Sequence, residues 1–168
     1  RVLGAEPGEE ISEATRQAGI PTLTGFFSEP LAKRIVNEHG RASVVTANNV
    51  AAHIDDLAGV MRGVAKLLAP DGVFVFEVSY LVDVFEKTLF DTIYHEHLDY
   101  HTVEPLVPFF ASCGLQLIEA TRVDSHGGSL RGVAQLAGGP RKVGASVGAP
   151  VAPVRGLELR DAEAIRAS

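Results

Sequence analysis

Short apolar runs alternate with amphipathic stretches through the first 78 residues, a pattern typical of strands that alternate with helices. Strands are predicted at residues 2–6, 20–24, 42–46 and 73–78. The helices predicted between them cover residues 9–18, a stretch from a Ser28 cap to about His39, and a stretch from Asp55 or Asp56 to the Pro70-Asp71-Gly72 break. This order predicts an α/β fold with a doubly wound sheet of parallel strands.

The pattern changes after residue 78. Residues 82–101 predict a helix followed by a loop, and Thr102 is placed to cap a helix over residues 103–112. Two further strands, 115–123 and 129–136, are joined by the His126-Gly127-Gly128 turn. Because this connection is so short, the two strands must pair antiparallel. From residue 137 onward the sequence is typical of a linker, with a weak helix at residues 157–167.

Composition and charge narrow the function classes. The 168 residues are 46% apolar and 21% charged, as in a globular protein, and the net charge of -6 argues against a nucleic-acid surface. Cys113 is the single cysteine, which excludes an internal disulfide. No apolar run approaches the ~18 residues of a membrane span, and no secretory leader opens the chain, so a cytoplasmic location is expected. Since Arg1 is followed at once by a strand-like Val2-Leu3-Gly4, we expect an internal fragment of a longer protein.

Several polar or aromatic residues follow the predicted strands. Glu6 ends the first strand, where a carboxylate can accept hydrogen bonds from ribose hydroxyls or simply be solvated. Asn48 and Asn49 either lie beside a cofactor or only form a turn, and His53 either faces a substrate or is structural. Phe26 lines an adenine pocket or packs in the core.

Three of the six histidines, His95, His97 and His101, fall within seven residues. His95 and His97 would share a face only on a strand, and this pair lacks the spacing of four used by helical zinc sites, so no metal site is predicted. Proton transfer is the better interpretation, because Tyr94, Glu96 and two histidines can place a base, its orienting group and an enolate stabiliser around one carbon. The alternative is a polar surface loop.

Longer motifs resemble a known family. Residues 67–72, ahead of the strand at 73–78, resemble the junction before the fifth strand of class I S-adenosylmethionine (SAM) methyltransferases, and the terminal antiparallel hairpin resembles theirs. Residues 47–53, 90–97 and 126–131 look like the motifs of the sugar C-methyltransferases, which methylate nucleotide-linked keto-deoxysugars in antibiotic biosynthesis. The resemblance spans roughly residues 2–136.

The resemblance implies a class I, Rossmann-like SAM methyltransferase fold whose N-terminal part is missing. Residues 1–136 would be a partial SAM domain, and residues 137–168 a linker and the start of a truncated C-terminal domain. The family's glycine-rich SAM motif and its zinc-binding domain would precede Arg1, so zinc is expected only there. Gly25 stands where class I enzymes often have an acidic residue, which would leave adenine to Phe26 and backbone groups.

The resemblance also implies the chemistry. A base removes the proton alpha to the sugar ketone, and the family pattern assigns this base to His97, with Tyr94, Glu96 and His53 as companions. An imidazole, with an ordinary pKa of about 6.5, suits this task. We expect Glu96 to hold a ring in its tautomer, and Tyr94 and His53 to donate to the enolate oxygen.

The cofactor implied is SAM, held by Glu6, Phe26, Asn48 and Asn49, and the partner is a nucleotide-linked keto-sugar. Two alternatives remain open. One is an O- or N-methyltransferase for a small molecule with the same fold, and the other is a non-catalytic fragment. The sequence does not predict the sugar, the carbon methylated, the stereochemistry or the oligomeric state.

Overall fold

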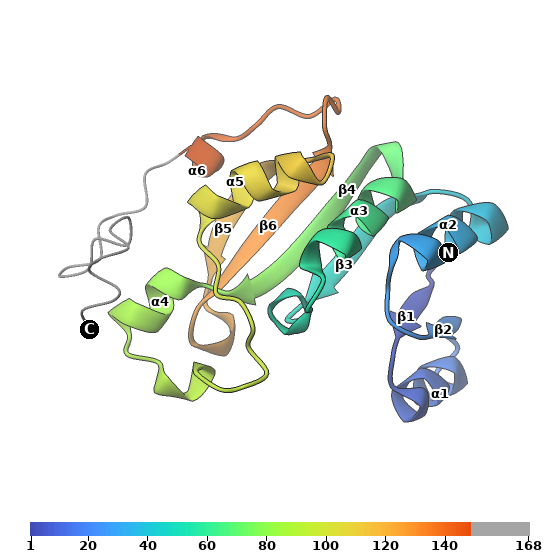
Figure 1. The fold of residues 1–168 in the computed structure, drawn as a ribbon, viewed down its shortest axis with the longest axis horizontal. Coiled ribbons are helices and arrows are strands. Elements are labelled where there is room, and N and C mark those ends of the chain that lie inside the picture. Colours follow the sequence, from blue (N-terminus) through green and yellow to red (C-terminus); the bar gives the residue numbers. More distant parts are fainter. Residues whose placement is uncertain (149–168) are drawn as a thin grey trace.

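The computed structural model describes residues 1–148, and the helix predicted at 157–167 lies outside them. Strands and helices follow one another as the sequence pattern indicates (Figure 1). The strands are β1 (Gly4–Glu6), β2 (Thr22–Thr24), β3 (Ala42–Asn48), β4 (Leu68–Ser79), β5 (Leu115–Val123) and β6 (Ser129–Leu136). The helices are α1 (Glu9–Gln17), α2 (Glu29–His39), α3 (Leu57–Leu67), α4 (Leu81–Glu86), α5 (Val103–Ser112) and α6 (Ala145–Gly148). Short 3₁₀ turns are η1 (Ala51–His53), η2 (Phe90–Thr92) and η3 (Ser125–Gly127).

Two predicted helix starts are confirmed by side-chain caps. The Ser28 hydroxyl accepts from the backbone N–H of Leu31 at 3.4 Å, and the Asp56 carboxylate accepts from the N–H of Gly59 at 2.8 Å. Asp56, and not Asp55, is therefore the cap of α3. Thr102 occupies the cap position of α5 but its side chain makes no capping hydrogen bond.

Some predicted boundaries are wrong. The strands expected at 2–6 and 20–24 are shorter, and β3 extends beyond Thr46 to Asn48. The predicted break at Pro70-Asp71-Gly72 lies inside β4, which already begins at Leu68 because Leu68 pairs with Ala42 before the register shifts. The stretch predicted as linker contains the short helix α6. Within residues 1–148, no helix is long and apolar enough to cross a membrane.

The strands form two sheets where one doubly wound sheet was expected. β1 and β2 pair parallel, and β3, β4, β6 and β5 form a second sheet in that order. β4 pairs parallel with β3 and antiparallel with β6, and β5 pairs antiparallel with β6, which confirms the predicted hairpin. Within the described residues, one edge of β1 and one edge of β3 carry no partner strand.

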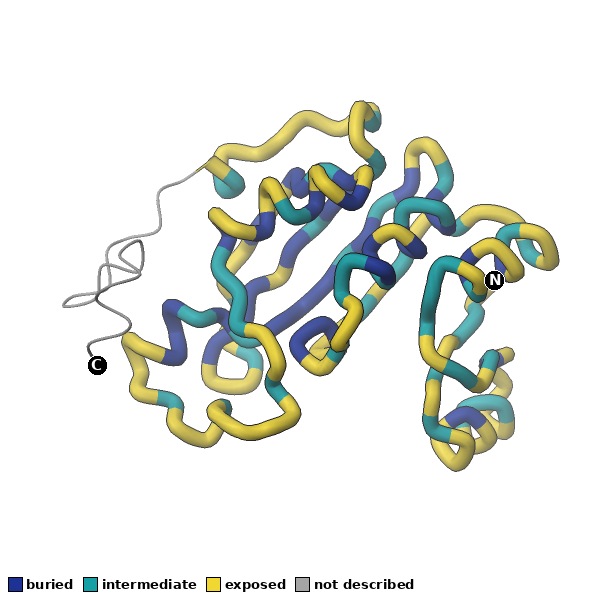
Figure 2. Tube along the Cα trace, viewed as in Figure 1, coloured by how far each residue is buried: buried dark blue, intermediate teal, exposed yellow. Residues whose placement is uncertain are grey.

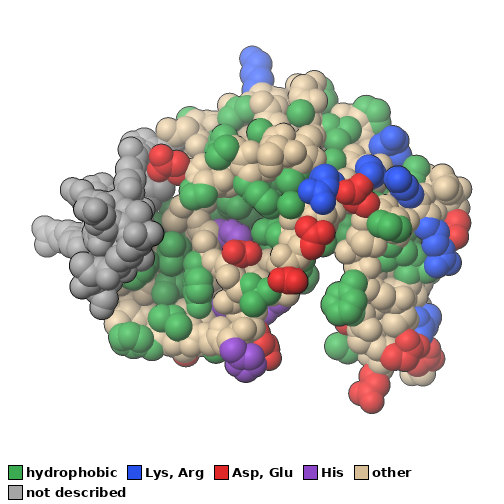
Figure 3. Space-filling model, viewed as in Figure 1, with side chains coloured by type: hydrophobic (Ala, Val, Ile, Leu, Met, Phe, Trp, Pro, Cys, Tyr) green, Lys and Arg blue, Asp and Glu red, His purple; other side chains and the backbone are tan. Residues whose placement is uncertain are grey.

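Helix α2 connects the two sheets. Its buried Ala32 and Ile35 pack with Leu3, which precedes β1, with Leu23 of the small sheet and with Val45 of the large one. One helix therefore covers both sheets, although they share no backbone hydrogen bond. Figure 3 shows a deep notch between the part that carries β1, β2 and α1 and the rest of the molecule.

The main core lies between β4 and the helices α3 and α5. Phe74, Phe76 and Val78 alternate along β4 and are buried, and Figure 2 shows this strand as the dark central element. The rings of Phe76 and Phe110 lie 5.3 Å apart. Phe76 also lies over Gly132 of β6, where an added Cβ would come within 2.2 Å of the ring. Glycine at this position is therefore what lets the ring lie flat against the sheet.

A buried carboxylate lies near the end of β4. Glu77 is only 7% exposed, and its carboxylate accepts from the Arg131 guanidinium of β6 at 2.8 Å and from the Ser125 hydroxyl. These hydrogen bonds, that of Ser125 foremost, hold the pKa of Glu77 below its usual value. Glu77 thus fixes both β6 and the turn that precedes it.

A second buried carboxylate, Asp83 of α4, is fully buried. It accepts two hydrogen bonds from the Arg122 guanidinium of β5, at 2.8 and 2.6 Å, and pairs with Lys87 at 2.7 Å. Burial raises its pKa, but the bonds from Arg122 and Lys87 outweigh burial and the pKa is lowered. Gly128 packs so closely that an added Cβ would lie 2.3 Å from the carboxyl carbon. The predicted glycine turn is therefore a packing site for this ion pair.

The fit between Gly132 and Phe76 predicts a stability effect. Gly132→Ala should lower the free energy of unfolding by about 1–3 kcal/mol, because the new methyl group must displace a ring that is buried in the core. The urea midpoint of this chain measures the loss. Gly148→Ala is the control, since an added Cβ at that position would contact nothing within 4 Å. Equal midpoints for the two variants would contradict the close packing.

The ion pairs of Asp83 predict an acid-sensitive contribution to stability. Because its pKa is lower in the folded than in the unfolded state, the contribution is present above the ordinary aspartate pKa of about 3.9 and is lost as the pH falls further. Asp83→Asn should lower the free energy of unfolding by about 1–3 kcal/mol near pH 7 and by much less near pH 3. Urea unfolding at both pH values measures this, with the exposed Asp71→Asn as control. A loss that is the same at both pH values would show that the charge of Asp83 is not responsible.

Candidate active site

The predicted histidine cluster lies on an irregular loop, residues 93–101, which we call the histidine loop. It follows η2 and leads into α5, and most of it is exposed (Figure 2). Two backbone hydrogen bonds hold it: the Leu98 N–H donates to Ala52 of η1 at 2.8 Å, and the Leu81 N–H donates to the His101 carbonyl at 3.0 Å. The loop is therefore fixed between η1 and the start of α4.

His97 is held in one orientation by a backbone carbonyl. Its Nδ1 lies 2.7 Å from the Thr92 carbonyl oxygen. A carbonyl can only accept, so Nδ1 must carry the proton, and the neutral ring then has its lone pair on Nε2. This is the tautomer that a base acting through Nε2 needs.

Tyr94 and His53 surround this ring. The Tyr94 hydroxyl lies 3.2 Å from His97 Nε2, where it can donate to the lone pair, and the two ring centroids are 4.4 Å apart. The His53 ring centroid is 4.9 Å from that of His97. Three of the four predicted catalytic side chains are thus brought together from η1 and the histidine loop.

The fourth, Glu96, takes part through its backbone. Its carbonyl oxygen lies 2.9 Å from His53 Nδ1, so this nitrogen also carries a proton. The Glu96 carboxylate is largely exposed, and it lies 3.9 Å from His95 Nε2. The structure therefore has a backbone carbonyl, and not the Glu96 carboxylate, on the Nδ1 of each ring.

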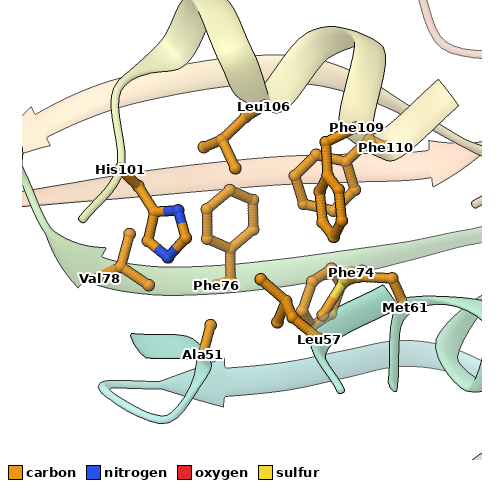
Figure 4. Close-up of a pocket in the computed structure, with 10 residues that line it drawn as sticks. All are labelled: Ala51, Leu57, Met61, Phe74, Phe76, Val78, His101, Leu106, Phe109 and Phe110. Atoms are coloured by element: carbon orange, nitrogen blue, oxygen red, sulfur yellow. The ribbon is translucent and has the colours of Figure 1, made fainter. Parts of the chain in front are cut away.

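The two remaining histidines of the cluster lie apart from this group. The His95 side chain is 90% exposed. His101 points instead into the apolar interior between α3, β4 and α5, beside Phe76 and Val78 (Figure 4). Its Nε2 is buried without a hydrogen-bond partner, and desolvation lowers its pKa. Neither ring is placed to act together with His97.

The residues predicted to bind the cofactor follow the carboxyl ends of β1, β2 and β3. One Glu6 carboxylate oxygen accepts from the Gly8 N–H at 2.8 Å, and the Phe26 ring is 82% exposed. Asn48 is exposed at the end of β3, and Asn49 adopts a left-handed conformation with φ of 53°. These ends lie at the same edge of the parallel strands, beside the notch (Figures 1 and 3).

Sequence reasoning missed two residues of the site. The Thr92 carbonyl orients His97, and the Tyr100 hydroxyl donates to the same oxygen at 3.0 Å. The Thr92 acceptor is a backbone group, which no residue type reveals in a sequence. Tyr100, by contrast, could have been chosen as a candidate because it lies three residues after His97. In residues 1–148, no group of three or more potential metal ligands is present.

Comparison with known proteins identifies the family. A family model described as a methyltransferase domain matches residues 3–120. The curated C-methyltransferase NovU of Streptomyces niveus is 38% identical over 130 residues, which are 77% of this chain and 31% of that protein. The chain thus spans about a third of the length of this relative.

Solved structures show the same fold. CcbJ, a methyltransferase of Streptomyces caelestis, superposes with a TM-score of 0.60 at 18% identity over 80% of this chain and 74% of that one. A SAM-dependent methyltransferase of Anabaena variabilis gives a TM-score of 0.62 at 15% identity over 81% and 68%. The α/β architecture and the family match agree, and the chain belongs to the methyltransferase domain family with the class I, Rossmann-like fold of SAM-dependent methyltransferases.

Proposed function

We propose that this chain is part of a SAM-dependent C-methyltransferase that acts on a nucleotide-linked keto-deoxysugar, with His97 as the base. The name of the relative NovU supports carbon as the acceptor atom. The observation that carries the proposal is the Thr92 carbonyl on His97 Nδ1, which leaves the lone pair of the neutral ring on Nε2. A heteroatom acceptor is already nucleophilic and has less need of such a base.

In this mechanism, His97 Nε2 removes the proton alpha to the substrate ketone. The Tyr94 hydroxyl, now 3.2 Å from that nitrogen, turns to donate to the enolate oxygen as negative charge develops there. Such stabilisation is needed because a proton alpha to a ketone is only weakly acidic. When bound, SAM supplies the electrophilic methyl group that the carbanion equivalent requires.

In this proposal, His53 contributes only when its ring carries a positive charge. Its Nδ1–H is occupied by the Glu96 carbonyl, so its Nε2 can donate to an enolate oxygen only if the ring carries both protons. Two imidazolium rings whose centroids lie 4.9 Å apart would repel each other. A cationic His53 beside a neutral His97 is the combination that the proposed mechanism requires, because it pairs an electrostatic stabiliser with a base.

The residues at the strand ends fit SAM by their chemistry. Glu6 offers a carboxylate at the end of β1, which is a suitable acceptor for two ribose hydroxyls. The exposed Phe26 ring offers an apolar face for adenine, and Asn48 and Asn49 offer polar groups at the next strand end. We assign these four residues to cofactor binding.

Residues 1–136 form part of the methyltransferase domain in this proposal, and residues from 137 onward begin the connection to a further domain. The two sheets lie under one helix, and β1 and β3 each have an edge without a partner strand among residues 1–148. A further parallel strand in the notch would join them into one sheet. The short span relative to NovU supports a longer enzyme.

The role of His97 is tested with His97→Ala in the longer enzyme. Methyl transfer should fall by about 10²–10⁴, the usual contribution of a positioned general base, while SAM affinity stays near normal. Exchange of the substrate's alpha proton with deuterated solvent, followed by NMR with an inert SAM analogue, should fall in the same proportion. His95→Ala is the matched control, and we expect it to change neither rate.

Three results would contradict the proposal. Full alpha-proton exchange in the His97 variant would move the base to another residue. Equal losses from both histidine variants, restored by added zinc, would indicate a metal site. Attachment of a labelled methyl group to oxygen or nitrogen, found by mass spectrometry of the product, would replace C-methylation by heteroatom methylation.

Cofactor binding is tested separately with Glu6→Ala. In the longer enzyme, SAM affinity should weaken by about 1.5–3 kcal/mol, because the ribose hydroxyls lose a charged acceptor. Titration calorimetry measures the change. Glu10→Ala, an exposed position on α1, is the control for loss of a negative charge. Unchanged affinity in the Glu6 variant would remove Glu6 from the cofactor site.

A further inference from the structure

Two side chains of the histidine loop bond to one backbone oxygen. The Thr92 carbonyl accepts from His97 Nδ1 at 2.7 Å and from the Tyr100 hydroxyl at 3.0 Å. The two rings meet edge to face, with centroids 5.9 Å apart and an interplanar angle of 88°. Tyr100 therefore contacts both the Thr92 carbonyl and the His97 ring that donates to this carbonyl.

We propose that Tyr100 is a positioning residue that fixes His97 as the Nδ1–H tautomer. Its functional consequence rests on the proposed role of His97 as the base. The Thr92 carbonyl belongs to η2, a single turn between α4 and the loop, so it is not part of a longer helix or a strand. The Thr92 hydroxyl bonds to Leu89 at 2.8 Å, which holds the residue from the other side.

The physical argument concerns the two neutral forms of the ring. In water, a histidine side chain prefers the proton on Nε2, which would leave no lone pair there. The Thr92 carbonyl reverses this preference only while it points at Nδ1. The hydrogen bond from Tyr100 restrains that direction, and the Tyr100 ring limits rotation of His97. Without the hydroxyl, the carbonyl turns more freely and the ring returns towards its preferred tautomer.

The three tyrosines of the chain provide a matched set of variants. Tyr100→Phe removes only the oxygen that bonds to Thr92. Tyr94→Phe removes the contact on the other ring nitrogen of His97. Tyr80→Phe alters a ring that lies 5.8 Å from the Arg122 guanidinium and does not contact Thr92 or His97, so it is the control.

Nitrogen-15 NMR of histidine-labelled longer enzyme at about pH 8 reports the tautomer directly, and the His97 signals are assigned by comparison with the His97→Ala spectrum. The unchanged enzyme should show His97 with its proton on Nδ1. Tyr100→Phe should produce a mixture with a readily detected Nε2–H form, whereas Tyr80→Phe should leave Nδ1–H predominant. A single Nδ1–H form in Tyr100→Phe would overturn the proposal.

Kinetics connect the tautomer to the reaction. Tyr100→Phe should lower kcat about tenfold, as expected for one hydrogen bond, with KM and SAM affinity unchanged. A tautomer shift without loss of kcat, in an enzyme that needs His97, would overturn the positioning role. If instead His97→Ala retains full activity, the proposed function fails while the tautomer result still tests Tyr100. The two failures are therefore distinguishable.

Discussion

Two carboxylates buried near the end of β4 constrain most of what surrounds the candidate site. A buried carboxylate is tolerated only where cations or hydroxyls satisfy it, so Glu77 and Asp83 dictate where their partners must lie. Glu77 holds Arg131 of β6, and Asp83 holds Arg122 of β5. Both ends of the hairpin turn are thereby fixed against β4 and α4. The chain runs from α4 to the histidine loop, which has little buried surface of its own and starts from this fixed region.

The candidate site and the sheet beneath it are stabilised by different interactions. Around β4, apolar side chains are packed closely enough that Gly132 has no room for a methyl group beside Phe76. The histidine loop is largely exposed, and the rings of His53 and His97 are oriented by donating to the backbone carbonyls of Glu96 and Thr92. Packing in the core thus determines the position at which the loop starts, and a few hydrogen bonds determine the orientation of the histidine rings. The proposed role of the Tyr100 hydroxyl at His97 therefore requires no contribution of that hydroxyl to the core.

The parts of the fold that the sequence predicted well have local causes. The bounds of β5, β6 and α5 agree because glycine turns and a 3.6-residue period depend on neighbours in the chain. The split into two sheets was not predictable, since strand pairing depends on which edges meet in space. The same holds for the ion pair between Asp83 and Arg122, which are 39 positions apart. At the site, the sequence supplied the residue types, but the orienting acceptors are carbonyls, which every residue possesses.

The matching hydrogen bonds on His53 and His97 bear on how the two rings could take different parts in the proposed mechanism. Both rings have Nδ1 tied to a carbonyl, so both direct Nε2 away from the backbone. Their identical anchoring does not decide which ring is charged, and their proximity only disfavours a charge on both at once. In the proposed mechanism the substrate supplies the asymmetry, because its ketone oxygen must lie nearest the cationic ring and its alpha proton must face the neutral one.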